Sequence, residues 1–214
     1  MKYLLFLLVF SFNSYSSTGQ LKKLLSTEKL KKSAVSEIKK LVEKSPKKMV
    51  PILISTMKDK TKSEQARWLS TVLIGKTMGR RSLDLMSKYA YHPDVILRMA
   101  SLKVLLSLQA KKKVKIFESA LFDKSLLVRQ QALESVKLLN LTSLGKKVLA
   151  MLFDKKNYTL QGKKLKRDPI MIDVVKVLGD LGYQKSKSLL VKMRSKKRYK
   201  DLHRAIDYSL AKLN

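Results

Sequence analysis

The stretch Ser125-Leu-Leu-Val-Arg129-Gln-Gln-Ala-Leu-Glu-Ser-Val136 carries a pattern that occurs twice earlier in the chain. Arg129 lies 31 residues after Arg98, and Arg98 lies 31 residues after Arg67. Each copy begins with a helix-starting polar residue and continues with apolar residues three and four positions apart, which is typical of an amphipathic helix. A fixed period of about 20–50 residues indicates stacked copies of one small unit instead of a single globular core.

The same register continues toward the C-terminus with two changes. Met171 and His203 stand where the three earlier copies have arginine. The step from Arg129 to Met171 is 42 residues, which is the 31-residue period plus 11 residues. This excess matches a basic stretch without apolar periodicity around residues 155–167. We interpret that stretch as an insertion; insertions in repeat proteins often fall on the binding face, and a merely tolerated surface loop is the alternative.

The composition of the chain also favours helices. Of its 214 residues, 45% are hydrophobic, which is normal for a folded protein. Only seven glycines and four prolines interrupt the sequence, so a many-turned β fold is disfavoured. The chain has no cysteine, which excludes disulfides, thiolate zinc sites and a lipid-modified cysteine.

Helices are expected to follow one another with short connections. Ser63 is a plausible N-cap for the Arg67 helix, and Asp168 before Pro169 is a strong signal for another helix start. The expected helices cover residues 27–43, 49–57, 63–74, 80–91, 93–109, 111–122, 125–140, 142–153, 168–182, 185–195 and 201–213.

Three short segments carry a family resemblance. Leu97-Arg98-Met-Ala100 and Val128-Arg129-Gln-Gln-Ala132 share an aliphatic residue, an arginine and then an alanine. Val177-Leu-Gly-Asp-Leu-Gly182 resembles the end of a repeat's second helix. With its period, the chain therefore resembles HEAT-like repeat proteins over roughly residues 27–214.

The resemblance implies an all-α fold, a right-handed α-solenoid of about five helix pairs in which each pair buries its apolar face on the next. In that family the repeat aspartate and arginine commonly interact between neighbouring units. The resemblance thus implies structural roles for Arg67, Asp94, Arg98 and Arg129.

The first residues look like a sorting signal. Lys2 is followed by the apolar run from Leu4 to Phe10 and by small residues at Ser14 and Ser16. The apolar run is shorter than the about 20 residues that span a membrane. We predict a signal peptide at 1–16, a mature N-terminal segment at 17–26 and a repeat domain at 27–214, exported to the periplasm or secreted. An uncleaved N-terminal anchor is the alternative.

Positive charge is the second strong feature. The chain has 47 Lys and Arg against 16 Asp and Glu, a formal net charge of +31. Such a field attracts nucleic acid, anionic lipid, anionic envelope polymer or an acidic protein surface. The alternative is that each basic run is only a solvent-exposed face without a binding role. The candidate anion- or partner-binding residues are Lys111, Lys112, Lys113, Lys163, Lys164, Lys166, Arg167, Lys196, Lys197 and Arg198.

No catalytic constellation is evident in the sequence. Nucleotide-binding, zinc-protease and serine-hydrolase motifs are missing, and so are the His-Glu dipeptides that metal-binding HEAT-like hydroxylases use. His92 is expected to lie exposed between helices, and His203 to have a packing role. Trp68, the only tryptophan, is either a stacking platform or a packing residue, of which we favour packing. We therefore expect no enzymatic activity, no cofactor and no metal.

The leading functional hypothesis is an exported, non-enzymatic interaction scaffold for an acidic protein or an anionic envelope component. The alternative is a nucleic-acid-binding protein related to HEAT-like DNA-repair glycosylases, whose basic surfaces hold phosphates. A third possibility is peripheral attachment to an anionic membrane.

Overall fold

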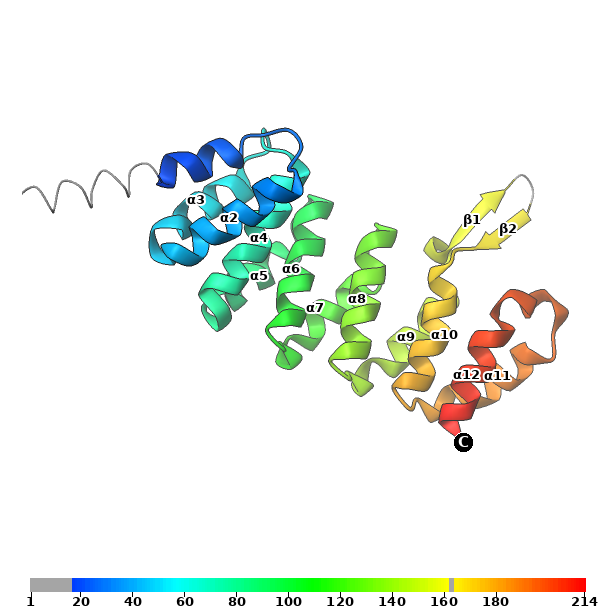
Figure 1. The fold of residues 1–214 in the computed structure, drawn as a ribbon. Helices are drawn as coiled ribbons and strands as arrows, with labels where there is room; N and C mark the ends of the chain where they lie inside the picture. Colours follow the sequence, from blue (N-terminus) through cyan, green and yellow to red (C-terminus); the bar gives the residue numbers. More distant parts are fainter. Residues whose placement is uncertain (1–16, 162–163) are drawn as a thin grey trace, which may run out of the picture. The chain divides into compact units, whose positions relative to one another are not determined.

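A computed structural model of the chain describes residues 17–161 and 164–214. Over these residues the fold is almost entirely helical, with one two-stranded antiparallel sheet (Figure 1). The chain divides between Val104 and Leu105 into two compact units, which are described separately. The predicted signal peptide at 1–16 and the candidate residue Lys163 lie outside the described residues.

The first unit is built from helices connected by short turns. Residues 17–24 are helical, and the helices that follow are α2 (Lys32–Lys44), α3 (Pro46–Lys58), α4 (Glu64–Met78), α5 (Leu83–Tyr89) and the start of α6 (Val95–Ser107). Helix α3 packs on α4, and α2 contacts both. Ile38, Leu53 and Ile74 are fully buried among these helices.

The second unit continues with α7 (Val114–Ala120), α8 (Leu126–Leu138), α9 (Gly145–Met151), β1 (Tyr158–Gln161), β2 (Lys164–Arg167), α10 (Ile170–Asp180), α11 (Lys187–Arg194) and α12 (His203–Leu213). Helix α10 packs against α8, α9 and α12, so it is central to this unit. Gly179 brings α10 and α12 together, because a Cβ atom there would lie 2.6 Å from the Ser209 Cα. The Ser209 hydroxyl donates to the Val175 carbonyl at 2.6 Å across this contact.

Three alternate helices, α6, α8 and α10, end in the same way. Gln109, Asn140 and Gly182 follow α6, α8 and α10, and their φ angles are 52°, 51° and 60°. In each case the next residue donates its N–H to the carbonyl five positions earlier, as in the Schellman motif. A 3₁₀ turn then leads into the following helix, at Lys111–Lys113, Thr142–Leu144 and Gln184–Ser186.

Several helix boundaries follow the sequence signals. The Ser63 hydroxyl accepts from the Ala66 N–H at 3.3 Å, which confirms the predicted N-cap of α4. Helix α2 begins at Lys32 instead of the expected residue 27. Helix α3 begins at Pro46 instead of 49, because proline lacks only an N–H that the first helical turn leaves free.

The described residues are all-helical as expected, apart from one short two-stranded hairpin. Within the stretch expected as an insertion without apolar periodicity, Tyr158–Gln161 and Lys164–Arg167 pair as the antiparallel strands β1 and β2. Tyr158 pairs with Arg167 and Leu160 with Leu165. In Figure 1 the hairpin projects from the N-terminal end of α10. Aromatic and β-branched residues at Tyr158 and Thr159 favour a strand, which a search for helical periodicity does not detect.

Among the described residues, no helix combines the length and apolarity needed to cross a membrane.

Candidate functional site

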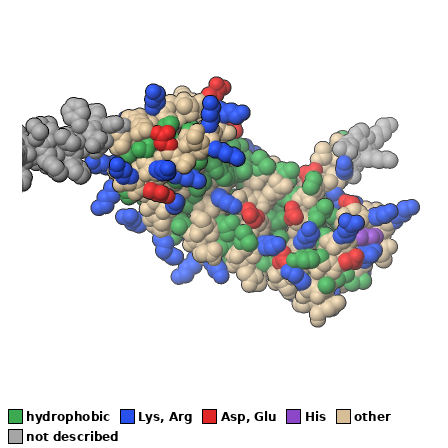
Figure 2. All heavy atoms as spheres, in the orientation of Figure 1, with side chains coloured by type: hydrophobic (Ala, Val, Ile, Leu, Met, Phe, Trp, Pro, Cys, Tyr) green, Lys and Arg blue, Asp and Glu red, His purple; other side chains and the backbone are tan. Residues whose placement is uncertain are grey.

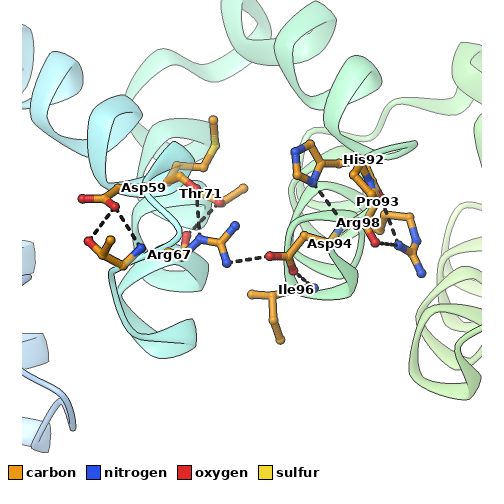
Figure 3. Close-up of polar contacts among 10 residues, drawn as sticks. Asp59, Arg67, Thr71, His92, Pro93, Asp94, Ile96 and Arg98 are labelled. Carbon is orange, nitrogen blue, oxygen red and sulfur yellow. Dashed lines mark hydrogen bonds and ion pairs between the residues drawn. The ribbon is translucent and has the colours of Figure 1, made fainter.

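Arg67 and Asp94 form an ion pair between α4 and the start of α6 (Figure 3). The Arg67 side chain is buried, and its Nη1 donates to Asp94 Oδ2 at 2.5 Å, while Nε donates to the Met57 carbonyl at 3.3 Å. Asp94 Oδ1 accepts from the Ile96 N–H at 2.8 Å, so the same carboxylate caps α6. Burial alone raises the pKa of Asp94, but the Arg67 hydrogen bond and the Ile96 N–H together hold it below its usual value.

Arg98 and Arg129 repeat one arrangement at their own helix starts. The Arg98 Nη1 donates to the carbonyls of His92 and Pro93, six and five residues earlier. The Arg129 Nη1 likewise donates to the carbonyls six and five residues earlier. Each arginine therefore ties its helix to the turn that precedes it.

Arg129 also reaches forward along the chain. Its Nε donates to Asn157 Oδ1 at 2.8 Å, and its Nη2 donates to the Lys156 carbonyl at 2.7 Å. Asn157 is fully buried and donates in turn to the Met151 carbonyl. The Arg129 guanidinium thus joins α8 to the segment just before the hairpin.

The two residues in register with these arginines differ in environment. Met171 is buried in the core, 1% exposed. His203 is half-buried, and its Nδ1 lies 3.0 Å from Arg194 Nη1. We expected His92 to be exposed, but it is half-buried. Its ring stacks on Tyr89, and its Nδ1 accepts from the Asp94 N–H.

The structure brings two of the predicted basic stretches together around Tyr199. The guanidinium carbons of Arg167 and Arg198 lie 5.0 and 4.9 Å from the centroid of the Tyr199 ring. Lys166, Lys196 and Lys197 are exposed beside them in the sequence. We call Lys166, Arg167, Lys196, Lys197, Arg198 and Tyr199 the Tyr199 cluster.

Arg167 serves as the internal support of the Tyr199 cluster. Its Nε and Nη2 donate to the two carboxylate oxygens of Asp201, at 3.0 and 2.7 Å, and Nη2 also donates to the Arg198 carbonyl. The Arg167 hydrogen bond lowers the pKa of Asp201, so this pair is charged at neutral pH. Arg167 therefore holds the hairpin against residues 198–201.

Lys111, Lys112 and Lys113 form a separate group in the turn between α6 and α7. Lys111 and Lys112 are exposed, and Lys113 is half-buried. The predicted cations therefore belong to two places in the second unit. The backbone of Lys164 lies in β2, opposite Gln161.

A half-buried carboxylate that the sequence did not single out connects three helices. Asp180 of α10 is 9% exposed at its side chain and pairs with Lys137 of α8 at 3.0 Å and with Lys212 of α12. The Tyr208 hydroxyl donates to it at 2.7 Å. Burial raises the pKa of Asp180, but these donors outweigh burial and the pKa lies below its usual value.

An apolar groove in the first unit contains Trp68. Leu30, Val35, Trp68, Leu69 and Ile96 line a hollow of about 480 Å³ together with Glu64 and Gln65. Trp68 is half-buried, so neither full packing nor a free platform describes it. The sequence pointed to this residue but not to the loop at Leu30 that forms the opposite wall.

The chain matches no family model, and no curated protein is similar to it in sequence. Across the described ranges, no three His, Asp or Glu side chains gather in a way that could hold a metal ion.

Proposed function

We propose that the chain is a HEAT-like α-solenoid of about five helix pairs that acts as an exported, non-enzymatic scaffold and binds an acidic protein or another anionic envelope component. The recurring arginine period and the three similar helix ends support the repeat architecture. The predicted signal at 1–16 supports export.

The Tyr199 cluster is the single observation that carries the choice of an anionic partner. The guanidinium groups of Arg167 in β2 and of Arg198, 31 residues apart in sequence, both lie at the Tyr199 ring, and exposed lysines adjoin each of them in the sequence. By contrast, the hollow between α8 and α10 is lined by acidic Glu134 and Asp173 as well as by Lys137 and Lys176. Figure 2 shows basic and acidic side chains mixed on its visible face. An anionic partner is therefore better matched by the Tyr199 cluster than by that hollow.

The test is capture of partners from an envelope extract at low and at high salt. Replacing Lys166, Lys196, Lys197 and Arg198 by alanine should abolish the salt-sensitive fraction, because rim charges set the electrostatic part of binding. The matched control removes four exposed lysines from the first unit, Lys44, Lys47, Lys48 and Lys58. Equal loss in both variants would show that only total charge matters, and recovery of no partner at either salt would contradict the proposal.

Nucleic-acid binding is the alternative function, since an aromatic ring among cations is typical of single-strand binding. The guanidinium groups of Arg167 and Arg198 already lie over the Tyr199 ring. Stacking of a base on that ring is therefore less favoured than binding of an acidic protein or polymer. A gel-shift titration distinguishes the two, because neutralised phosphates make affinity fall steeply with salt. Sedimentation with anionic vesicles tests membrane attachment in the same way.

A further inference from the structure

The Trp68 groove has the size and lining of a docking site for side chains. Its volume of about 480 Å³ lies within the about 300–1,000 Å³ typical of ligand sites. Trp68 and Leu69 come from α4, Val35 from α2 and Ile96 from α6. Aliphatic and aromatic groups from three helices therefore face one hollow that is open to solvent.

The loop that forms one wall of the groove is held in place by hydrogen bonds. The Leu30 N–H donates to Gln65 Oε1 at 2.9 Å, at the first turn of α4. Two further bonds join the same pair of segments, from Lys62 Nζ to Ser26 Oγ at 2.8 Å and from the Ser63 hydroxyl to the Thr27 carbonyl at 3.4 Å. The wall is thus formed before a partner arrives, which reduces the entropy lost on binding.

Positive charge follows the same side of the groove. Lys29, Lys31 and Lys32 are exposed on both sides of Leu30. A second hollow of about 350 Å³ shares Leu30 and Val35 with the first and is lined by Lys32, Ser36 and Lys39. Glu64 is the one acidic residue among those that line either hollow. An apolar floor with lysines along one edge is complementary to a segment that has apolar anchors and acidic neighbours.

We propose that this groove binds an acidic amphipathic helix of a partner protein, with aliphatic anchors three and four residues apart seated against Trp68 and carboxylates facing Lys32 and Lys39. In helix-in-groove complexes, apolar side chains at that spacing on one face of the helix bind in the groove. The inference rests on the proposed function only in the acidity of the partner, because the groove lies in the first unit and the Tyr199 cluster in the second.

Trp68 makes the test direct, because it is the only tryptophan of the chain and half-buried in the groove. The probe is a tryptophan-free synthetic peptide of about 18 residues, five helical turns, with leucine at helical spacing and glutamate between. We expect saturable blue-shifted emission and about twofold weaker quenching by acrylamide, as the peptide removes the indole from water. A scrambled peptide of equal composition should bind at least about tenfold more weakly.

Two pairs of variants assign the binding to the groove. Ile96→Lys should weaken binding of the peptide about tenfold or more, while Leu138→Lys, at a residue 57% exposed in the second unit, should leave it unchanged. Lys32→Glu with Lys39→Glu alters two exposed side chains and is expected to leave the fold intact. That double variant should weaken binding and reduce its salt dependence, whereas Lys44→Glu with Lys48→Glu should not. Circular dichroism verifies that each variant is folded.

Several results would overturn the inference and leave the proposed function standing. One is a labelled peptide that binds without any change in Trp68 emission, and another is equal binding of the scrambled peptide. An identical emission change with inorganic polyphosphate would show that charge alone suffices, and a change only with anionic vesicles would assign the groove to a lipid surface. If the Tyr199 cluster variant abolished peptide binding while the Ile96→Lys variant did not, the docking site would lie in the second unit.

Discussion

Buried guanidinium groups hold several of the helix starts in place. Arg129 is 2% exposed and donates to three backbone carbonyls and to the Asn157 amide oxygen. The bond to Asn157 is buried, so its amide oxygen loses its partner away from water if the guanidinium is removed. An unsatisfied buried acceptor costs about 1–3 kcal/mol.

Arg129→Leu should therefore lower the free energy of unfolding by about 3 kcal/mol or more. Arg204→Leu, at an exposed position of α12, is the control and should change it by less than about 0.5 kcal/mol. Urea titration followed by circular dichroism measures both. Similar small effects in the two variants would mean that the Arg129 contacts are not stabilising.

Asp180 makes stability depend on pH in a defined direction. Because its folded pKa lies below the usual 3.8, its contribution is complete above that value and is lost as pH falls through the folded pKa. Asp180→Asn should destabilise the chain at pH 7, and this effect should shrink as pH falls through the folded pKa of Asp180. Thermal unfolding of both proteins from pH 7 to pH 2 provides the comparison, and a constant difference in midpoint would contradict this role.

Left-handed residues end α6, α8 and α10, and only one of the three is glycine. Gln109 and Asn140 adopt φ angles of 52° and 51°, a region that costs a non-glycine residue about 1 kcal/mol. Asparagine tolerates this region better than glutamine, whose side chain cannot form the same local hydrogen bonds. Gln109 is therefore the least favourable of the three helix ends.

Gln109→Gly should stabilise the chain by about 0.5–1 kcal/mol, because glycine adopts the left-handed region without strain. The matched control is Gln131→Gly inside α8, which should destabilise it by about 1 kcal/mol. Both changes are measured by thermal unfolding. Destabilisation by both would mean that the side chain of Gln109 has a role in the fold beyond its backbone angle.

Local signals in the sequence predicted the elements better than their contacts. Ser63 located the start of α4 because its hydroxyl caps that helix. The Asp168-Pro169 pair lies just before α10, but Asp168 was wrongly expected as its cap: the N-cap is Pro169, and the Asp168 carboxylate accepts from the Thr159 hydroxyl. The hairpin was missed since strands of four residues carry too little periodicity. The Tyr199 cluster, the Asp180 contacts and the Leu30 wall of the groove depend on residues about 30 positions apart, which no local pattern pairs.

At the scale of the whole molecule, the proposed solenoid makes a prediction about size. A compact globule of about 200 residues has a radius of gyration of about 16 Å. A stack of helix pairs, each in contact only with its neighbours, is longer than such a globule. Small-angle scattering of the monomer in high salt, which suppresses association through charge, should give a clearly larger radius and a skewed distance distribution. A radius near that of the globule would contradict the solenoid.

The contacts of Arg67 with Asp94 and of Arg129 with Asn157, called here the Arg67 joint and the Arg129 joint, differ in one respect. The Arg67 joint relies on Asp94, a carboxylate that takes up a proton in strong acid. The Arg129 joint is closed by an amide and by peptide carbonyls, and none of these titrates. Acidification would thus release the start of α6 and leave the link between α8 and the segment just before the hairpin intact.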